Sequence, residues 1–456
     1  MRIIQFVTEA LGDASYLVIS GSEAAVIDPQ RDVTPFVVAA AAAGAAIRFV
    51  FETHVHNDYL SGGRELSALG ATIVAPAGCG LQFPHRPISD GDEVHVGGAR
   101  LRAVATPGHT YEHTAYLAIG EDGSVAGAFT GGGVLIAAAG RSDLLGDEHT
   151  EDLTRLQWES GQRIAALLPQ TAEILPTHGA GSFCSSTGAG LERRAPLAAE
   201  LGRNPLFSAG NYEEFRRIHL AVTMPVPGYY EHMAPLNRSG VHVFGKPPQP
   251  ARLNPGALIS YRDAGVPVID VRPRLEHAEA HIPRSIGIEE SDSLLAYVGW
   301  LVPFNTPFAL VAQDGRQAAR VSTDLLRIGY EGVRGYLPFS DWRAESLPTE
   351  RIALVTVAEA VEHWQSGRMP VLDVRFSYEQ TAAPLEGTLR RTIDTLPAWL
   401  PEVPDGPVLM VCASGQRAVM AASILQAQGG DALALGDAGA TELNALACAR
   451  PPSASR

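Results

Sequence analysis

Four histidines and one aspartate in the first half of the chain occur where they could bind a metal ion. His54, His56 and Asp58 form a His-x-His-x-Asp run after an apolar stretch, and His109 and His178 each stand beside a glycine further along. Imidazole nitrogens and carboxylate oxygens are common ligands of zinc and iron. Because each run follows a predicted strand, where loops gather functional side chains, we expect these residues to converge on one site.

A second chemical centre is predicted near the C-terminus, where Cys412 begins the run Cys-Ala-Ser-Gly-Gln-Arg. The run follows an apolar strand over 407–411 and opens a helix expected from 418 to about 428. A loop in this position points backbone N–H groups inward and adds the helix dipole, so it favours a thiolate or persulfide at Cys412 rather than a buried structural thiol. The predicted site comprises Cys412, Ser414, Gly415 and Arg417, the last adding positive charge at the rim.

The elements that carry these residues form three parts, as 456 residues exceed the usual size of one domain. Proline density marks a linker, and the run Pro-Val-Ile-Asp-Val-Arg at 267–272 returns as Pro-Val-Leu-Asp-Val-Arg at 370–375. We therefore predict a first domain over 1–244, a linker over 245–254, and two copies of one unit over 255–347 and 348–450.

The pattern of each part predicts its fold class. In the two copies, short apolar runs alternate with helical stretches, which is typical of a parallel sheet with helices on both faces. The first part begins with short alternating strands over 15–20 and 24–28, then a helix over 37–46 and a buried strand over 49–53. The chain is thus expected to be a multidomain protein of the α/β and α+β classes.

Composition excludes several kinds of partner. The formal charge of −15 argues against nucleic acid and anionic membranes, and no apolar run is long enough to span a bilayer. The first residues lack the pattern of a signal peptide, so we expect a cytoplasmic protein. The four cysteines are widely spaced without a CxxC pair, so a cysteine that matters here is expected to act as a thiol.

The ordered histidine motifs resemble those of the metallo-β-lactamase superfamily over about residues 1–240. That superfamily has an HxHxDH run, a His in a TPGH turn, an Asp after a strand and a last His. The resemblance implies an αββα sandwich. This chain departs from the pattern at Tyr59, which replaces the last histidine of HxHxDH, and at Gly132, where the ligand aspartate is expected. A two-metal hydrolase site is therefore not expected.

Segments 25–32, 51–54 and 140–145 are similar to the persulfide dioxygenase branch of that superfamily, particularly the forms fused to rhodanese domains. This resemblance implies one iron(II) per chain, with O₂ and a thiol persulfide such as glutathione persulfide as substrates and sulfite as product. It also implies a homo-oligomer, a dimer formed through the first domain.

Matched to that branch, the iron ligands are His54 and His109, while the carboxylate has no counterpart. His56 can supply a third nitrogen, with Asp58 and His178 supporting the ligands or completing the coordination. The same nitrogens with a water would suit zinc and a mononuclear hydrolase. A metal-free domain that serves as a scaffold or binding module is the other alternative. We place persulfide oxidation first, because it agrees with the sulfur chemistry expected at Cys412.

The run from Cys412 to Arg417 looks like the active-site loop of rhodanese sulfurtransferases, and residues 372–375 look like their early strand motif. The resemblance implies attack of the Cys412 thiolate on a sulfane-sulfur donor, giving a Cys412 persulfide. The middle copy aligns Ala312 with Cys412 and Gln317 with Arg417, so it is expected to be a rhodanese-like domain without catalysis. Cys184, on a Gly- and Ser-rich loop after His178, is predicted either to be buried or to relay sulfane sulfur.

Overall fold

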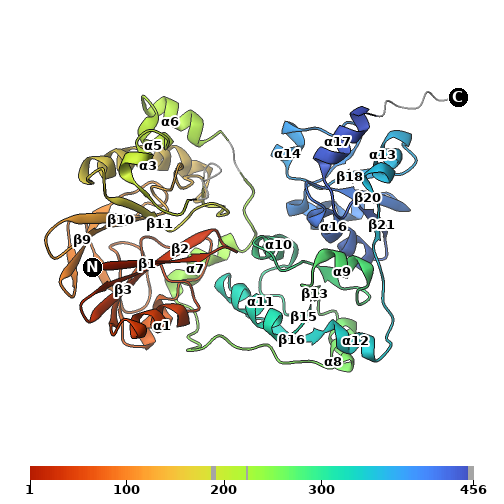
Figure 1. Cartoon of the computed structure of the whole chain (residues 1–456), viewed down its shortest axis with the longest axis horizontal. Helices are drawn as coiled ribbons and strands as arrows, with labels where there is room; N and C mark the ends of the chain where they lie inside the picture. The colour runs from red at the N-terminus through yellow and green to blue at the C-terminus, as the bar shows by residue number, and fades with distance from the viewer. Residues whose placement is uncertain (186–191, 222–223, 450–456) are drawn as a thin grey trace. The chain divides into compact units, whose positions relative to one another are not determined.

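The computed structural model describes residues 1–185, 192–221 and 224–449, and these form two compact units (Figure 1). The first unit holds residues 1–248 and the short segment 326–329, and the second holds 249–325 and the chain from 330 onward. The division after Pro248 falls inside the proline-rich segment, where few backbone hydrogen bonds can form.

The first unit contains two six-stranded sheets packed face to face. One sheet has the order β1-β2-β3-β4-β5-β6 and the other β12-β11-β10-β9-β8-β7. The first sheet consists of β1 (Arg2–Thr8), β2 (Asp13–Ser20), β3 (Glu23–Ile27), β4 (Ala46–Phe51), β5 (Thr72–Pro76) and β6 (Arg86–Ile88). The second consists of β7 (Glu93–Val96), β8 (Ala99–Ala105), β9 (Thr114–Ile119), β10 (Val125–Gly131), β11 (Glu173–Pro176) and β12 (Ala195–Pro196).

Helices cover both outer faces of these sheets, giving four layers in the order αββα. The helices of the unit are α1 (Thr34–Ala42), α2 (Gly63–Ala68), α3 (Asp147–Leu167), α4 (Leu197–Glu200), α5 (Pro205–Ser208), α6 (Tyr212–His219) and α7 (Tyr230–Ser239). Tyr16, Phe51 and Phe129 fill the core between the sheets, while Phe36 of α1 and Ile164 of α3 lie in separate clusters on the two outer faces. Figure 1 shows α1 and α3 on opposite sides of the sheets.

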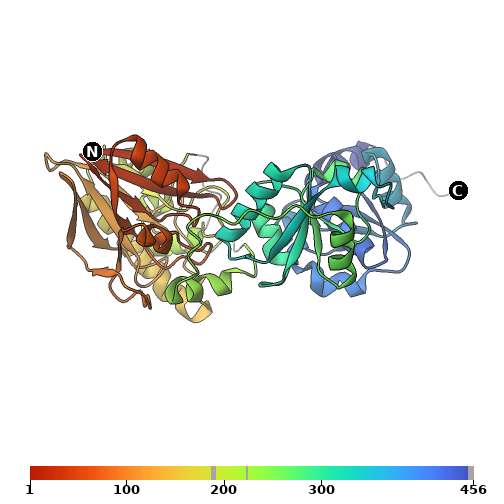
Figure 2. The same cartoon turned by 90° about the horizontal axis from the view of Figure 1, so that it is seen from below.

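The second unit contains two parallel sheets. The middle domain has the order β14-β13-β15-β16 and the C-terminal domain β17-β21-β20-β18-β19, and Figure 2 shows them from below. The middle domain comprises α8 (Pro255–Asp263), β13 (Val268–Asp270), α9 (Arg274–Glu279), β14 (Ile286–Gly287), α10 (Leu294–Leu301), β15 (Phe308–Ala312), α11 (Gly315–Arg327), β16 (Val333–Pro338) and α12 (Phe339–Ala344). The C-terminal domain comprises β17 (Ala353–Leu354), α13 (Val357–Ser366), β18 (Val371–Asp373), α14 (Ser377–Ala382), β19 (Leu389–Arg390), α15 (Leu396–Trp399), β20 (Pro407–Val411), α16 (Gln416–Ala427), β21 (Asp431–Ala434) and α17 (Ala440–Ala449).

The repeated Asp-Val-Arg run forms the same buried ion pair in the middle and C-terminal domains. Arg272 Nε donates to Asp270 Oδ1 at 2.9 Å, and Arg375 Nε donates to Asp373 Oδ1 at the same distance. Each arginine is 4% exposed or less and also donates to a backbone carbonyl eight residues further on. Such a buried charge pair needs this full set of hydrogen bonds, which fixes the turn after β13 and β18.

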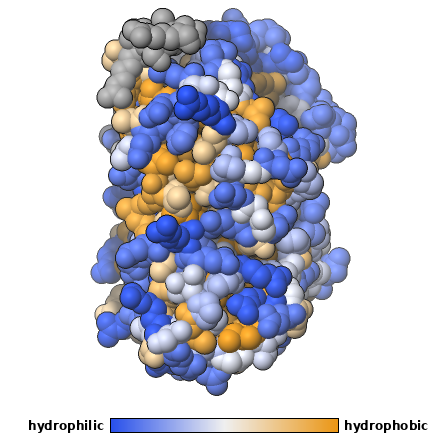
Figure 3. Space-filling model, turned by 90° about the vertical axis from the view of Figure 1, so that its right-hand side faces the viewer, coloured by the Kyte–Doolittle hydropathy of each residue, from blue (hydrophilic) through white to orange (hydrophobic). Residues whose placement is uncertain are grey.

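Several predicted elements lie close to their observed bounds. β20 covers the predicted residues 407–411, whereas α16 begins at Gln416, two residues before the predicted start, because Gly415 adopts a φ of +88° and ends the preceding loop. None of the helices formed by the described residues has the length and apolar character that crossing a bilayer requires. Figure 3 shows a face on which hydrophilic side chains surround smaller apolar areas.

Candidate metal centre and candidate sulfur-transfer centre

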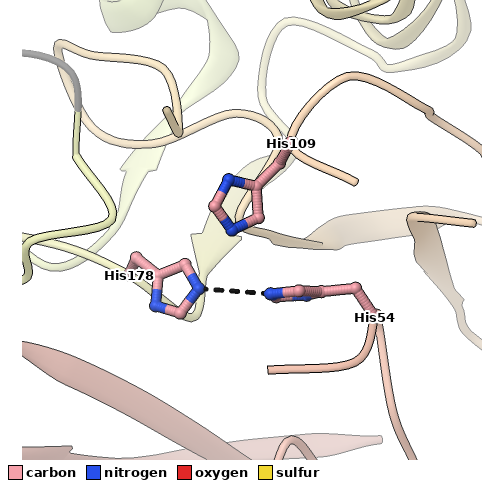
Figure 4. Close-up of side chains that lie close together, drawn as sticks. All are labelled: His54, His109 and His178. Carbon is pink, nitrogen blue, oxygen red and sulfur yellow. Dashed lines mark hydrogen bonds between the residues drawn. The ribbon is translucent and has the colours of Figure 1, made fainter. Parts of the chain in front are cut away.

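The structure brings three of the four predicted histidines together with their Nε2 atoms facing one another. His54 follows β4, His109 follows β8 and His178 follows β11, so the loops after these strands meet at one edge of the sandwich. Figure 4 shows the three rings, and the Nε2 atoms of His54 and His178 are 3.3 Å apart. All three residues are 1% exposed. One ligand atom from each lies within 4.8 Å of the others, which is close enough to share one ion.

The other ring nitrogen of each histidine is held by a hydrogen bond. His109 Nδ1 donates to the carbonyl oxygen of Arg141 at 2.7 Å, and His54 Nδ1 lies 2.8 Å from Thr53 Oγ1. Thr53 Oγ1 donates its own proton to Asp28, so it accepts from His54. These bonds place the proton on Nδ1 and leave the lone pair on Nε2, which is the arrangement metal-binding histidines use. His109 Nε2 has no hydrogen-bond partner in the described part of the chain.

Two carboxylates orient His178. Its Nδ1 lies 2.9 Å from Asp13 Oδ1 and 3.1 Å from Asp58 Oδ2. Burial lowers the pKa of His178, but Asp58 and Asp13 outweigh it and raise that pKa above its ordinary value. Burial and the neighbouring Asp58 raise the pKa of Asp13 to about 7. Asp58 therefore supports a candidate ligand, and Asp13 is a functional candidate that the sequence did not reveal, since it precedes His178 by 165 residues.

The charge state of the other two rings favours metal binding. Burial, followed by the neighbouring imidazoles, holds the pKa values of His54 and His109 well below the ordinary value. Both rings are therefore neutral at physiological pH and offer a nitrogen lone pair. The neutral rings of His54 and His109 share this focus with His178, whose Nε2 becomes a ligand once it gives up its proton, and the three together fit a single iron or zinc ion.

His56 turns its Nε2 away from this focus. That atom lies 3.3 Å from Asp28 Oδ1, 3.5 Å from Glu52 Oε2 and 3.0 Å from the hydroxyl of Tyr59. Burial disfavours the charged ring, but Asp28 and Glu52 outweigh it and raise the pKa of His56 to about 10. Its Nδ1 has no hydrogen-bond partner among the described residues. His56 thus keeps one nitrogen that could bind a metal after the ring loses its second proton.

The two departures from the superfamily pattern have structural consequences. A Cβ atom on Gly132 would lie 2.2 Å from His109 Cδ2, so a carboxylate-bearing side chain cannot fit there beside the ring. Tyr59 is buried, stacks on His56 at a ring distance of 4.3 Å, and bonds through its hydroxyl to the backbone of Asp28. The site therefore lacks both the bridging carboxylate and the histidine that a second metal ion would use.

Cys184 is fully buried, and its Sγ lies 3.9 Å from the hydroxyl of Tyr230. Burial raises the pKa of the Cys184 thiol well above its ordinary value, which disfavours the nucleophilic thiolate. Its carbonyl accepts the N–H of Arg141, the residue whose own carbonyl holds His109. Cys184 thus lies near the candidate metal centre, and its role as a sulfur relay stays a prediction.

Cys412 lies at the end of β20 with its side chain inside a tight loop. The N–H of Gly415 donates to Cys412 Sγ at 3.1 Å. A Cβ on Gly415 would lie 2.1 Å from the carbonyl oxygen of Gly436, so this turn requires glycine for space as well as for its positive φ. The backbone hydrogen bond and the start of α16 both favour negative charge on the sulfur.

The sequence predicted that Arg417 adds positive charge at the rim of the loop, and in the structure this charge is paired with Glu379. Arg417 is 7% exposed, donates to Glu379 Oε1 at 2.9 Å and lies over the ring of Phe376 at 4.9 Å. Burial lowers the pKa of Arg417, but the effect of Glu379 is larger and raises that pKa above its ordinary value, so Arg417 stays charged and paired. The sequence missed Glu379 because the pairing joins α14 to α16, 38 residues apart.

The middle domain has the same loop position without the sulfur. Ala312 ends β15, and Gln317 replaces the arginine, accepting the N–H of Gln313 at 2.8 Å and donating to the carbonyl of Val271 at 3.1 Å. These bonds close the loop, and the Gln317 amide also donates to Glu290 Oε2 at 3.1 Å. The middle domain therefore has no nucleophile at this position.

Comparison with known proteins finds relatives of the first domain and of the middle domain. The sequence model of the rhodanese-like domain family matches residues 255–338. A hydroxyacylglutathione hydrolase of Acidiphilium cryptum is 30% identical over 229 residues, which are 45% of this chain and 90% of that protein. Another, of Rhodospirillum rubrum, is 33% identical over 150 residues, 32% of this chain and 54% of that protein.

Among solved structures, a metallo-β-lactamase from Staphylococcus aureus is 26% identical, with a TM-score of 0.67. The match covers 74% of this chain and 99% of that one. These similarities confirm the predicted metallo-β-lactamase fold and the rhodanese-like fold of the middle domain.

Proposed function

Because the chain belongs to the metallo-β-lactamase-fold family that contains the hydroxyacylglutathione hydrolases, and carries a rhodanese-like domain, we propose that it is a two-centre enzyme of sulfur metabolism. One centre is a single iron(II) site at His54, His109 and His178 that oxidises a thiol persulfide such as glutathione persulfide. The other is Cys412, which transfers sulfane sulfur. The observation that carries the proposal is the convergence of three Nε2 atoms where Gly132 leaves no room for a bridging carboxylate.

The residues of the first centre divide the work between binding and orientation. The Nε2 atoms of His54, His109 and His178 would hold an iron(II) ion, which would supply the redox chemistry for oxidising a persulfide with O₂. Asp13 accepts the Nδ1 proton of His178 while Asp58 lies 3.1 Å from the same nitrogen, and the Arg141 carbonyl accepts the Nδ1 proton of His109. Burial of all three rings excludes bulk water, which protects a persulfide from side reactions.

At the second centre the Cys412 thiolate attacks the sulfane sulfur of a donor such as thiosulfate. The S–S bond of the donor breaks, its electron pair leaves with sulfite, and Cys412 becomes a persulfide. A second thiolate or cyanide then attacks the outer sulfur and releases the Cys412 thiolate. The Gly415 N–H, 3.1 Å from the sulfur, supports the negative charge that Cys412 carries before and after each step.

Hydrolysis of a glutathione thioester is the second candidate function, because the Acidiphilium cryptum relative is named a hydroxyacylglutathione hydrolase. A mononuclear zinc site at the same histidines would serve that reaction. Tyr59 and Gly132 argue against a two-metal version of the site. A metal-free first domain that acts as a scaffold for the sulfurtransferase is the third alternative.

Product analysis separates these functions. With glutathione persulfide in air, the proposal predicts sulfite formation with matching O₂ consumption, and no hydrolysis of S-lactoylglutathione. Thiosulfate and cyanide should yield thiocyanate. Thioester hydrolysis without O₂ uptake would favour the zinc hydrolase, and thiocyanate formation alone would favour the scaffold.

A further inference from the structure

The peptide between Ser414 and Gly415 is held at both ends. Its N–H, from Gly415, points at Cys412 Sγ at 3.1 Å. Its carbonyl oxygen, from Ser414, accepts a hydrogen bond from Arg274 Nη2 at 3.3 Å. A trans peptide is planar, with its N–H and C=O directed oppositely, so a group that holds the oxygen also sets the direction of the N–H. Arg274 therefore sets where this N–H points.

Arg274 belongs to the middle domain, where it is the first residue of α9. Its Nε donates to the carbonyl of Gly436 at 3.0 Å, so the guanidinium bridges two segments of the C-terminal domain. The same Gly436 carbonyl lies so close to Gly415 that no Cβ would fit between them. Glu289 anchors Arg274 from the other side, at 3.0 Å from Nη1 and 2.9 Å from its backbone N–H. Arg274 thus binds the Ser414 carbonyl of the Cys412 loop and the Gly436 carbonyl that packs against this loop.

Further contacts tie the same two domains of the second unit together. Gln416 Nε2 donates to Ser291 Oγ at 2.9 Å, and the Gly287 N–H donates to Ser423 Oγ at 2.9 Å. Both α9 and β14 pack against α16, the helix that begins at the Cys412 loop. The cysteine-less domain is therefore held against the loop and α16 by polar contacts at Arg274, Ser291 and Gly287, of which the Arg274 contact reaches the peptide that faces the sulfur.

We propose that Arg274 is a positioning residue for sulfur transfer at Cys412, so that the middle domain is a working part of that centre. By donating to the Ser414 carbonyl, Arg274 orients and polarises the peptide whose N–H supports negative charge on Cys412 Sγ. Arg417 does not supply this function, because Glu379 already engages it. The inference rests on the proposed sulfurtransferase function.

The test compares the full-length wild type with Arg274→Ala, Arg274→Lys and the control Arg252→Ala. Arg252 is an exposed arginine just before α8 that pairs with Asp341 of α12. Iodoacetamide alkylation of Cys412, followed by mass spectrometry of its peptide across pH, reports the anionic sulfur directly. Thiocyanate formation from thiosulfate and cyanide reports turnover.

For Arg274→Ala we expect the midpoint of the alkylation profile to rise by about one pH unit and kcat to fall about tenfold, the effect of weakening one charge-assisted hydrogen bond. Arg274→Lys should recover most of both, and Arg252→Ala should match wild type. A wild-type profile and turnover in Arg274→Ala would overturn the inference.

If Arg274→Ala does not fold, Glu289→Gln tests the same contact by loosening the anchor of Arg274, with the same expected direction. Failure of the wild type to form thiocyanate would refute the proposed function instead. The alkylation profiles would still decide whether Arg274 controls the Cys412 sulfur.

Discussion

Replacing Gly132 with alanine tests whether His109 needs the space beside Gly132 in order to bind the metal. The new Cβ would lie 2.2 Å from Cδ2 and 2.7 Å from Nε2 of His109. Non-bonded carbons rest about 3.5–4.0 Å apart, so the His109 ring or the turn after β10 must move by more than about 1 Å. A ligand tolerates only about 0.2 Å of error, and loss of a supporting group alone weakens metal binding about 10–100-fold. We therefore expect Gly132→Ala to bind iron at least about 100-fold more weakly.

The assay is iron per chain by mass spectrometry, on protein purified without oxygen and with iron supplied. Gly202→Ala is the matched control, since a Cβ there meets nothing within 4 Å. Overpacking costs about 1–3 kcal/mol, so thermal unfolding and thiocyanate formation must show that the variant still folds. Wild-type iron content in folded Gly132→Ala would refute the assignment of His109 to the site.

Three further predictions follow from named residues. Cys412→Ser should abolish thiocyanate formation and leave O₂ uptake with glutathione persulfide unchanged. Burial raises the pKa of Asp270, but the effects of His277 and Arg272 are larger and lower that pKa to about 2. The ionised carboxylate should therefore add roughly 2 kcal/mol of stability above pH 4, which is lost as pH falls through 2. Asp270→Asn should remove this part of the pH dependence of urea unfolding. Burial lowers the pKa of His219 to about 4, so as pH falls the unfolded chain binds this proton before the folded chain does. The free energy of unfolding should fall by roughly 3 kcal/mol from pH 6.5 to pH 4. His219→Gln should flatten that slope.

The parts of the fold that the sequence predicted are those in which short motifs carry the information. The repeated Asp-Val-Arg runs led to two copies of one parallel α/β unit, and the structure forms the same buried pair from Asp270 with Arg272 and from Asp373 with Arg375. The strand before Cys412 was recognisable because an apolar run ended directly at a glycine-containing loop. Local pattern suffices where a residue contacts its own neighbours in sequence.

The remaining features depend on contacts between distant segments. The HxH run made His56 a natural third ligand, yet its Nε2 lies 3.3 Å from Asp28, which follows β3, and 3.5 Å from Glu52, four residues before it. Asp13 reaches His178, and Arg274 reaches Ser414, across 165 and 140 residues. No spacing rule in one sequence reveals such pairs, because tertiary packing alone brings them together.

The most direct test of the central claim measures iron content and O₂ uptake with glutathione persulfide together. The comparison is wild type against His54→Ala, His109→Ala and His178→Ala, with His149→Ala as a control because His149 is a solvent-exposed histidine of the same domain. The account predicts about one iron per wild-type chain, with iron and O₂ uptake lost in the three site variants and kept in the control. Wild-type protein that binds no iron and consumes no O₂ would contradict it and leave Cys412 as the active centre.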